Sequence, residues 1–167
     1  MTGVVLLNTD YQILGIVSIR KAMKLLAKKK AEVVRSTEKF IHTVTTAYLY
    51  PLVIKLVKLV RMLWGKRVPY SKRNLLTLYG GKCAYCGKKD THMTLDHIIP
   101  KSRGGKSEYS NVVPCCLRCN NVKDNRLPSE AGMVLRYKVI IPTISEFLLL
   151  QVKHLGVDAT LRELGVI

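Results

Sequence analysis

Apolar residues in the first part of the chain occur in short runs separated by polar turns. The runs at residues 4–8 and 13–17 are apolar, and the turn-prone NTDYQ ends the first of them. Each run therefore predicts a β-strand. The segments at residues 31–35 and 40–50 are rich in β-branched and aromatic side chains, which predicts strands there as well.

Two stretches have the spacing of amphipathic helices. Apolar residues recur at helical intervals over residues 19–29, and Ser18 is placed to cap that helix. Pro51 is placed to begin a second helix, with Lys55, Lys58 and Arg61 three apart on its outer side. Alternation fits a strand over residues 52–56 equally well, so the pattern leaves both structures open there. The inward residues of the second helix would be Leu52, Leu56, Leu59, Val60 and Leu63.

The cluster GKRVPY at residues 65–70 combines charge, glycine and proline, and it predicts a domain boundary. After it, Ser71 is placed to cap a short helix that runs to about Leu78 and ends at Gly80-Gly81. Later, residues 95–97 and a segment that begins near Asn111 predict a two-stranded hairpin, and a short helix should follow Cys119.

The end of the chain predicts helices. Thr143 and Glu146 form a capping box, and Gly156 is placed to end the helix that follows it. Asp158 is placed to cap a last short helix. We therefore expect an α+β fold in three parts: a basic N-terminal α+β domain at residues 1–65, a central domain at 66–130 and a helical tail at 131–167 that packs on the N-terminal domain, with self-association as the alternative.

The composition is that of a globular protein, and the charge is strongly positive. Hydrophobic residues make up 48% of the 167 residues, and the formal net charge is +17. Residues 1–65 and 66–130 each carry +8, whereas residues 131–167 carry +1. The first two parts therefore have the charge of proteins that bind a polyanion such as nucleic acid. The near-neutral tail does not favour a DNA-binding helix-turn-helix.

The pattern predicts no membrane span and no secretory signal. Basic residues interrupt the longest apolar stretch, residues 48–64, and the start of the chain has no basic segment before its apolar run. These features predict a cytoplasmic protein, in which paired cysteines more often bind metal than form disulfides.

All five cysteines lie in a segment of 41 residues, from Cys83 to Lys123. Two Cys-x-x-Cys pairs within it each offer two thiolates to one ion, which predicts a closed, structural zinc site. Cys115 is the fifth cysteine, and its four-residue separation from Cys119 leaves a second pairing open. The predicted zinc ligands are Cys83, Cys86, Cys116 and Cys119.

Between the pairs lie Leu95-Asp96-His97-Ile98-Ile99-Pro100, a basic loop KSRGGKSE, and Asn111-Val112-Val113-Pro114, and Asn120 follows the last cysteine. A hairpin and a helix joined by one zinc ion would bring Asp96, His97 and Asn120 toward each other. In this order and spacing the segment resembles the HNH endonuclease family, in its form with a four-cysteine zinc site. The stretch LLNTDYQILGIVSIRKAMKLLAKKKAEVV near the start also resembles the leader of a subset of bacterial and phage HNH proteins.

This resemblance implies a ββα-metal fold that hydrolyses a DNA phosphodiester with one divalent cation. It implies that Asp96 and Asn120 hold Mg²⁺ or Mn²⁺, that His97 is the general base, and that Asn111 orients the His97 imidazole by a hydrogen bond. Cations are expected to meet the phosphates of double-stranded DNA. They are Lys123, one helical turn after Asn120, with Arg103 and Lys106 on the Gly-Gly loop.

Two other functions stay open at this stage. The first is a zinc-stapled DNA-binding protein without catalysis, such as an accessory factor in phage packaging or regulation. The presence of Asp96, His97 and Asn120 argues against it. The second is a nuclease that acts on RNA, because phosphate chemistry barely distinguishes the two polymers. A homodimer or phage packaging proteins are the expected protein partners.

Overall fold

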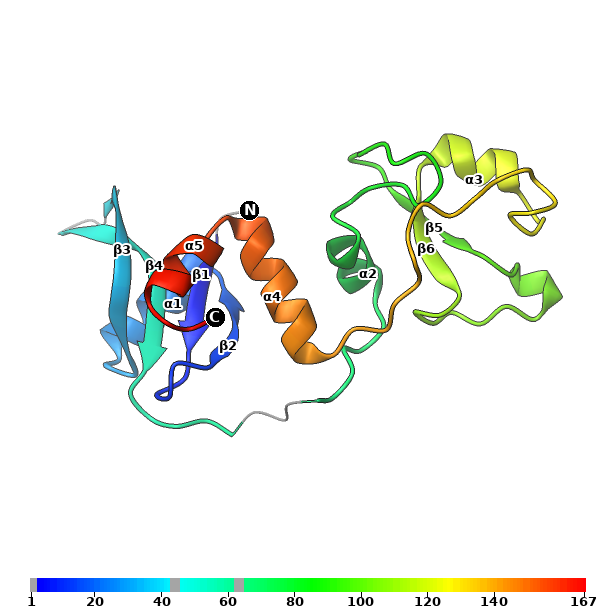
Figure 1. Ribbon diagram of the computed structural model, residues 1–167. Helices are drawn as coiled ribbons and strands as arrows, with labels where there is room; N and C mark the ends of the chain where they lie inside the picture. Colours follow the sequence, from blue (N-terminus) through cyan, green and yellow to red (C-terminus); the bar gives the residue numbers. More distant parts are fainter. Residues whose placement is uncertain (1–2, 43–45, 62–64) are drawn as a thin grey trace. The chain divides into compact units, whose positions relative to one another are not determined.

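A computed structural model of the chain describes residues 3–42, 46–61 and 65–167. The fold is α+β, as predicted, and it divides into two compact units (Figure 1). Unit 1 consists of residues 1–64 and 148–167, and unit 2 consists of residues 65–147. The expected tail is thus shared: its first part belongs to unit 2, and its helical end belongs to the unit that contains the N-terminal sheet.

Unit 1 is built on a four-stranded mixed sheet with the order β2-β1-β4-β3. β1 pairs in parallel with β4, and the other two pairings are antiparallel. The predicted strands at the start of the chain are confirmed, while the predicted strand over residues 40–50 is divided between β3 and β4. The strands are β1 (Val4–Leu7), β2 (Ile13–Val17), β3 (Ala31–His42) and β4 (Ala47–Leu56).

Helix α1 (Ile19–Ala27) covers one face of this sheet. As predicted, the Ser18 side chain accepts a hydrogen bond from the backbone N–H of Lys21. Ala22 is fully buried against Val4 and Ile54, because the short side chain lets the helix approach the strands closely.

The prediction of a helix beginning at Pro51 is wrong. Residues 51–56 continue strand β4, as the competing alternation allowed, and Val53 and Ile54 are both fully buried because this strand lies inside the sheet. Proline cannot donate to a strand ladder, and Pro51 lies opposite Ser36 where the register of β3 and β4 is irregular. Residues 62–64, which include the end of the predicted helix, lie outside the described residues.

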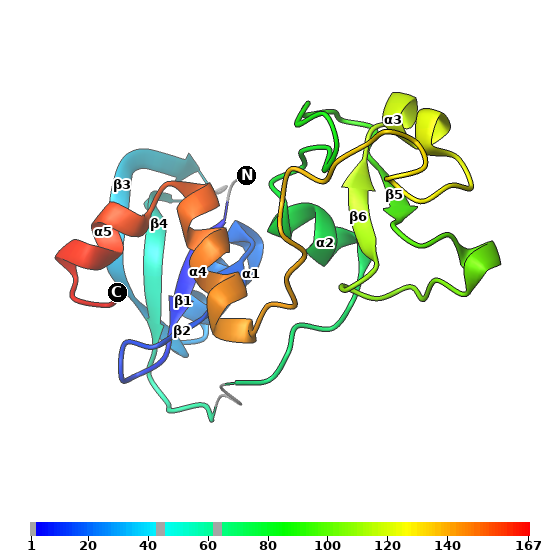
Figure 2. The same ribbon diagram turned by 45° about the vertical axis from the view of Figure 1, so that its right-hand side comes forward.

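The C-terminal helices are α4 (Ile144–Leu155) and α5 (Asp158–Glu163). The predicted capping box is present, since the Thr143 N–H donates to Glu146 and the Glu146 N–H donates to the Thr143 hydroxyl. Gly156 follows α4 with φ of 71°, a conformation that favours glycine. Asp158 is the first residue of α5 rather than its cap. Figure 2 shows α5 in front of the sheet of unit 1.

Unit 2 contains a two-stranded antiparallel hairpin followed by a helix. In its register Asp96 lies opposite Val113, and His97 lies opposite Val112. Ser71 caps the preceding helix by accepting from the Asn74 N–H, as predicted. The elements are α2 (Lys72–Leu78), β5 (Thr94–His97), the short 3-10 helix η1 (Lys101–Arg103), β6 (Val112–Cys115) and α3 (Leu117–Lys123).

After α3, the chain returns in extended form over the hairpin. Met133, Leu135, Tyr137 and Val139 pack against the cysteine-rich core, while the residues between them are exposed. This alternation is that of an extended segment covering one face of a core. No helix in the described parts of the chain is long and apolar enough to cross a membrane.

Candidate active site and zinc centre

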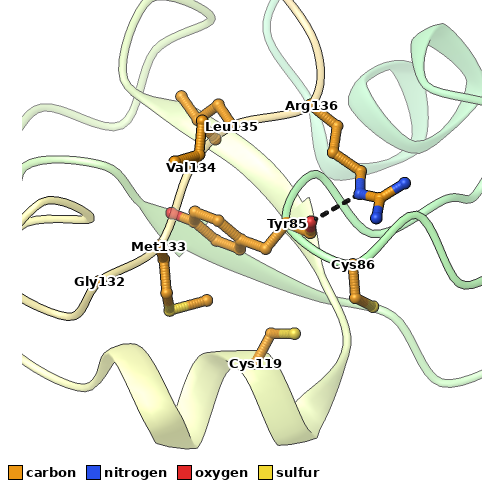
Figure 3. Close-up of a pocket in the computed structure, with 8 residues that line it drawn as sticks. All are labelled: Tyr85, Cys86, Cys119, Gly132, Met133, Val134, Leu135 and Arg136. Atoms are coloured by element: carbon orange, nitrogen blue, oxygen red, sulfur yellow. Dashed lines mark hydrogen bonds between the residues drawn. The ribbon is translucent and has the colours of Figure 1, made fainter.

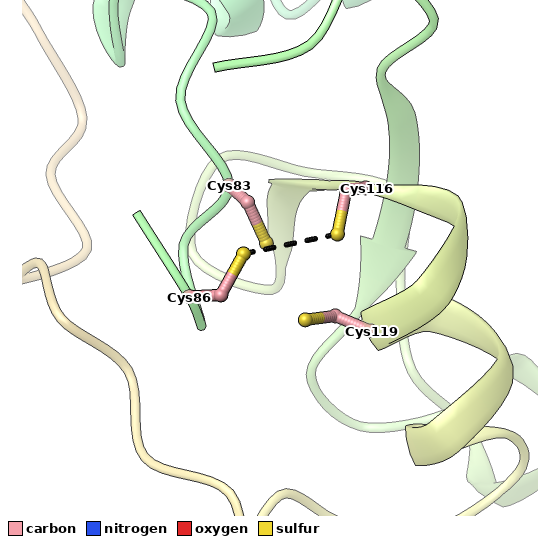
Figure 4. Close-up of side chains that lie close together, drawn as sticks. All are labelled: Cys83, Cys86, Cys116 and Cys119. Carbon is pink, nitrogen blue, oxygen red and sulfur yellow. Dashed lines mark hydrogen bonds between the residues drawn. The ribbon is translucent and has the colours of Figure 1, made fainter. Parts of the chain in front are cut away.

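Four cysteine sulfurs converge at the start of α3. The Sγ atoms of Cys83, Cys86, Cys116 and Cys119 all lie within 4.8 Å of one another (Figure 4). The Cys86 and Cys116 sulfurs are 3.8 Å apart, which is about the edge of a tetrahedron of sulfurs around zinc at a bond length of ~2.3 Å. The donor set and its spacing therefore fit a structural zinc ion.

The chain around the cysteines holds this arrangement. The backbone N–H of Cys83 donates to Lys88, and that of Ala84 donates to Pro114, so the first cysteine loop is tied to β6. Burial raises the pKa of the Cys83 thiol, but backbone hydrogen bonds from Cys116, Cys86 and Tyr85 outweigh it and lower this pKa to about 6. The lowered pKa favours the thiolate form of Cys83, which is the form that binds metal.

Cys115 lies beside the cysteine cluster but is not one of its four members, which favours the pairing of Cys116 with Cys119. Its sulfur donates to the Cys116 carbonyl oxygen at 3.3 Å, and its side chain is fully buried. Burial raises the pKa of the Cys115 thiol. Cys115 is therefore a buried neutral thiol in the core.

A pocket of about 440 Å³ lies beside the cysteines (Figure 3). Tyr85 lies in its wall, and Arg136 donates from Nε to the Tyr85 carbonyl oxygen at 3.0 Å. The pocket is thus formed between the first cysteine loop, α3 and the returning extended segment. Its lining is Tyr85, Cys86, Cys119 and residues 132–136.

Asp96 lies near the end of β5, in a buried polar network. Only 5% of the residue is exposed. Its Oδ2 accepts a hydrogen bond of 2.6 Å from the Tyr85 hydroxyl, and its Oδ1 lies 3.0 Å from the Lys123 ammonium. The ammonium also donates to the carbonyl oxygen of His97 at 2.8 Å. Lys123 thus fixes both the carboxylate and the backbone at the end of β5.

This position of Lys123 corrects one expectation. Lys123 is fully buried, so its ammonium neutralises Asp96 inside the domain instead of meeting a phosphate at the surface. Arg103 forms an ion pair with Glu130 at 2.7 Å, and both side chains are partly exposed. Lys106 is exposed on the Gly-Gly loop, as a contact with phosphate requires.

His97 is half-buried, and its Nε2 lies 2.8 Å from the Ser107 hydroxyl. Because side chains alternate along a strand, His97 points to the opposite face of β5 from Asp96. Burial lowers the pKa of His97, and the charge of Lys101 lowers it further. The imidazole is therefore neutral at pH 7 and able to accept a proton.

Asn111 does not hold the His97 imidazole, contrary to expectation. Its Oδ1 accepts from the Ile99 N–H at 2.8 Å, and its Nδ2 donates to the carbonyl oxygens of Ile99 and Lys106. The buried amide thus closes the loop between the two strands. Asn111 shapes the backbone that carries Ser107, and it is Ser107 that contacts the imidazole.

Asn120 lies on α3, where it faces the same side of β5 as Asp96. Its Nδ2 donates to the Thr94 hydroxyl at 3.2 Å, and Thr94 and Asp96 share one face because they are two residues apart on a strand. The structure therefore brings Asp96 and Asn120 to the face of β5 that meets α3, with His97 on the other face.

Comparison with known families agrees with this geometry. Residues 83–136, which include the cysteines, the hairpin, α3 and the start of the returning segment, match the family model of the HNH endonuclease. The chain carries an HNH endonuclease domain. Residues 4–64 match the HNH endonuclease-associated N-terminal domain. No curated protein matches the chain.

The polar groups of the HNH domain have the donor chemistry for a second, harder ion. Divalent cations such as Mg²⁺ prefer oxygen ligands, and Asp96 with Asn120 offers carboxylate and amide oxygens on one face. Each Asp96 oxygen already accepts one hydrogen bond, and a carboxylate has about four lone-pair positions in all. A cation bound there would share Asp96 with the Lys123 ammonium.

Two contributors to the HNH site escaped the sequence analysis. Tyr85 stands between the cysteines of the first pair, where the spacing assigns roles only to the sulfurs. A buried tyrosine needs a partner for its hydroxyl, and that rule is the signal that points from Tyr85 to a nearby polar group. Ser107 stands in a polar loop, and we find no signal in the sequence that distinguishes it from its neighbours.

Proposed function

We propose that this protein is a metal-dependent endonuclease that hydrolyses phosphodiester bonds in double-stranded DNA. What supports the proposal is the match of residues 83–136 to the HNH endonuclease family, together with a neutral imidazole, His97, next to the Asp96 carboxylate at the end of β5. A base and a carboxylate on adjacent residues of β5, with the Asn120 amide on α3, are residue types that suit hydrolysis of a phosphodiester.

In this proposal His97 is the general base, which takes a proton from the attacking water. Its lowered pKa keeps the imidazole unprotonated at neutral pH. Ser107 holds the ring through Nε2, which limits rotation of the imidazole and favours one tautomer. Precise orientation matters, because a proton acceptor must lie within hydrogen-bond reach of the water.

Asp96 and Asn120 would hold Mg²⁺ or Mn²⁺, whose charge would stabilise the phosphate as negative charge develops. Tyr85 and Lys123 hold the Asp96 carboxylate in one orientation from two sides. Lys106 is exposed and cationic, which suits a contact with a phosphate near the site. Arg103 is shared with Glu130, so its contribution to DNA binding would be smaller.

Charge supports DNA as the substrate. The chain carries +17, and about half of this excess lies in residues 66–130 around the HNH domain. Cations in such number attract a polyanion and release its counterions on binding. A duplex, with two phosphates for each base pair, offers a higher charge density than a single strand.

The proposal is tested by nicking of supercoiled plasmid in Mg²⁺ or Mn²⁺. We expect His97→Ala to abolish nicking while zinc content and unfolding transition stay as in the wild type. His92→Ala is the matched control, because His92 is an exposed histidine in the loop before β5. Equal nicking by the wild type and His97→Ala would refute the role of His97, and faster cleavage of a matched RNA duplex would refute DNA as the substrate.

A zinc-stapled DNA-binding protein without catalysis is the second candidate. The observation in its favour is that both Asp96 oxygens are bonded to donors of the protein itself, one of them a cation. DNA binding with no nicking in either metal, from a protein with full zinc content, would select this candidate.

A further inference from the structure

Helix α1 and the turn after it expose a dense group of cations. Six lysines and arginines lie between residues 20 and 30, and no acidic residue occurs between Asp10 and Glu32. We call this group the α1 basic surface. All six residues are exposed: Arg20, Lys21, Lys24, Lys28, Lys29 and Lys30.

Two of these cations, Arg20 and Lys21, oppose the electrostatics of their own helix. The amino-terminal end of a helix carries partial positive charge and favours acidic residues. The first turn of α1 has none, and Arg20 and Lys21 occupy it. Arg20 and Lys24, and Lys24 and Lys28, are also four residues apart, where like charges repel. The cations of the first turn therefore carry a cost to the stability of the helix, whereas Lys24 lies in the last turn, where positive charge is favourable.

Lys29 adds a backbone cost. Its φ is 53°, in the left-handed region, and its N–H donates to Leu26 in the turn that ends α1. Glycine is the usual residue where a helix ends in this conformation, because a Cβ atom is unfavourable there. A lysine at this position lowers the stability of the turn and adds one more exposed ammonium group to the surface.

The α1 basic surface is not neutralised by the protein. Within the described residues, no ion pair joins any of its six cations to an acidic group, although Lys55 in the same unit pairs with Glu32 and Arg35 pairs with Glu163. The apolar side of α1 is packed in the core of the sheet. The exposed side of the helix is thus mainly cationic.

We propose that the α1 basic surface binds the phosphate backbone of duplex DNA. A surface dense in unpaired cations, on a helix whose larger apolar side chains pack on the sheet, suits phosphates, and it gives affinity without base specificity. An anionic membrane is the competing polyanion, but membrane-surface helices insert their apolar face, and that of α1 is buried. The choice of DNA over other polyanions rests on the proposed function. The observation that the six cations are unpaired does not depend on it.

The test measures binding of a labelled duplex to the full chain without Mg²⁺ or Mn²⁺, over a series of salt concentrations. For the triple variant Lys21→Gln, Lys24→Gln, Lys28→Gln we expect affinity to fall at least about tenfold and the slope of log K against log salt to fall by about 2.7, since each lost phosphate contact removes ~0.9. The control is Lys58→Gln, Lys153→Gln, Arg162→Gln, which removes the same charge from other exposed sites of unit 1.

Lys29→Gly separates binding from folding. We expect this variant to bind DNA more weakly and yet to melt about 2–4 °C higher, because glycine relieves the left-handed strain. Equal affinity and salt slope in the two triple variants would overturn the proposal. Loss of binding to phosphatidylserine vesicles in the first triple variant, with DNA binding unchanged, would assign the surface to membranes. This test measures binding and not cleavage, so it is independent of the nicking test. A protein that binds DNA through α1 but does not nick plasmid would refute only the proposed function.

Discussion

The hydroxyl of Tyr85 donates a 2.6 Å hydrogen bond to Oδ2 of Asp96, and both residues are buried. Tyr85 lies between Cys83 and Cys86, so this bond connects the first cysteine loop directly to β5. Burial raises the pKa of Tyr85, and its bond to Asp96 raises it further, so the hydroxyl keeps its proton and remains a donor. The structural zinc site thus helps to orient the carboxylate of the candidate active site.

Replacing Tyr85 by phenylalanine tests this connection. Tyr85→Phe removes the donor and leaves Oδ2 of a buried carboxylate without its partner, which we expect to lower the free energy of unfolding by about 1.5–3 kcal/mol. Urea unfolding of the zinc-loaded protein measures the loss. Tyr48→Phe is the control, because Tyr48 is exposed. Equal stability of the two variants would mean that the bond contributes nothing.

The buried pair of Lys123 and Asp96 predicts a strong coupling between two substitutions. Lys123→Met leaves a carboxylate buried without its cation, and we expect this to cost about 3–5 kcal/mol of stability. Asp96→Asn in the same chain removes the uncompensated charge, so the double variant should be more stable than Lys123→Met alone. Additive effects in the unfolding free energies of this double-mutant cycle would contradict the pairing.

The loop between β5 and β6 requires glycine at position 105. A Cβ atom there would lie 1.7 Å from the Ile99 carbonyl oxygen and 2.8 Å from Nδ2 of Asn111, and these are the atoms that close the loop. We expect Gly105→Ala to open these bonds, to cost about 1–3 kcal/mol and to speed hydrogen exchange at the Ile99 amide. Lys106→Ala, a neighbouring exposed site, should leave exchange at Ile99 unchanged.

The parts of the fold that depend on local chemistry were predictable from the sequence. Ser18, Ser71 and the Thr143–Glu146 box cap their helices as expected, because capping involves residues at most three apart. The order of hairpin, cysteine pair and helix in unit 2 also followed from spacing. Both are properties of neighbouring residues, which a sequence displays directly.

What escaped prediction depends on three-dimensional context. The strand after Pro51 is selected by its place between β1 and β3, since its own pattern fits helix and strand alike. Lys123 looked like a phosphate contact because nothing in its neighbours shows that its ammonium reaches Asp96, 27 residues earlier. Asn111 is likewise the residue to which the family resemblance gives the role of orienting the His97 imidazole. In the structure its side chain instead bonds to backbone atoms of Ile99 and Lys106.

The two adjacent cysteines at the end of β6 provide a matched pair of substitutions. Cys116→Ser should lose zinc and much of the folded structure of unit 2, because its sulfur is one of four around the metal site and a structural zinc ion supplies folding free energy directly. Cys115→Ser should keep one zinc ion for each chain and lose only about 1–3 kcal/mol of stability, because it places a hydroxyl in an apolar core. Zinc content by mass spectrometry and unfolding by circular dichroism separate the two outcomes. Loss of zinc from Cys115→Ser with retention in Cys116→Ser would show that Cys115 pairs with Cys119. The first cysteine loop, which carries Tyr85, would then be joined through zinc to Cys115 instead of Cys116.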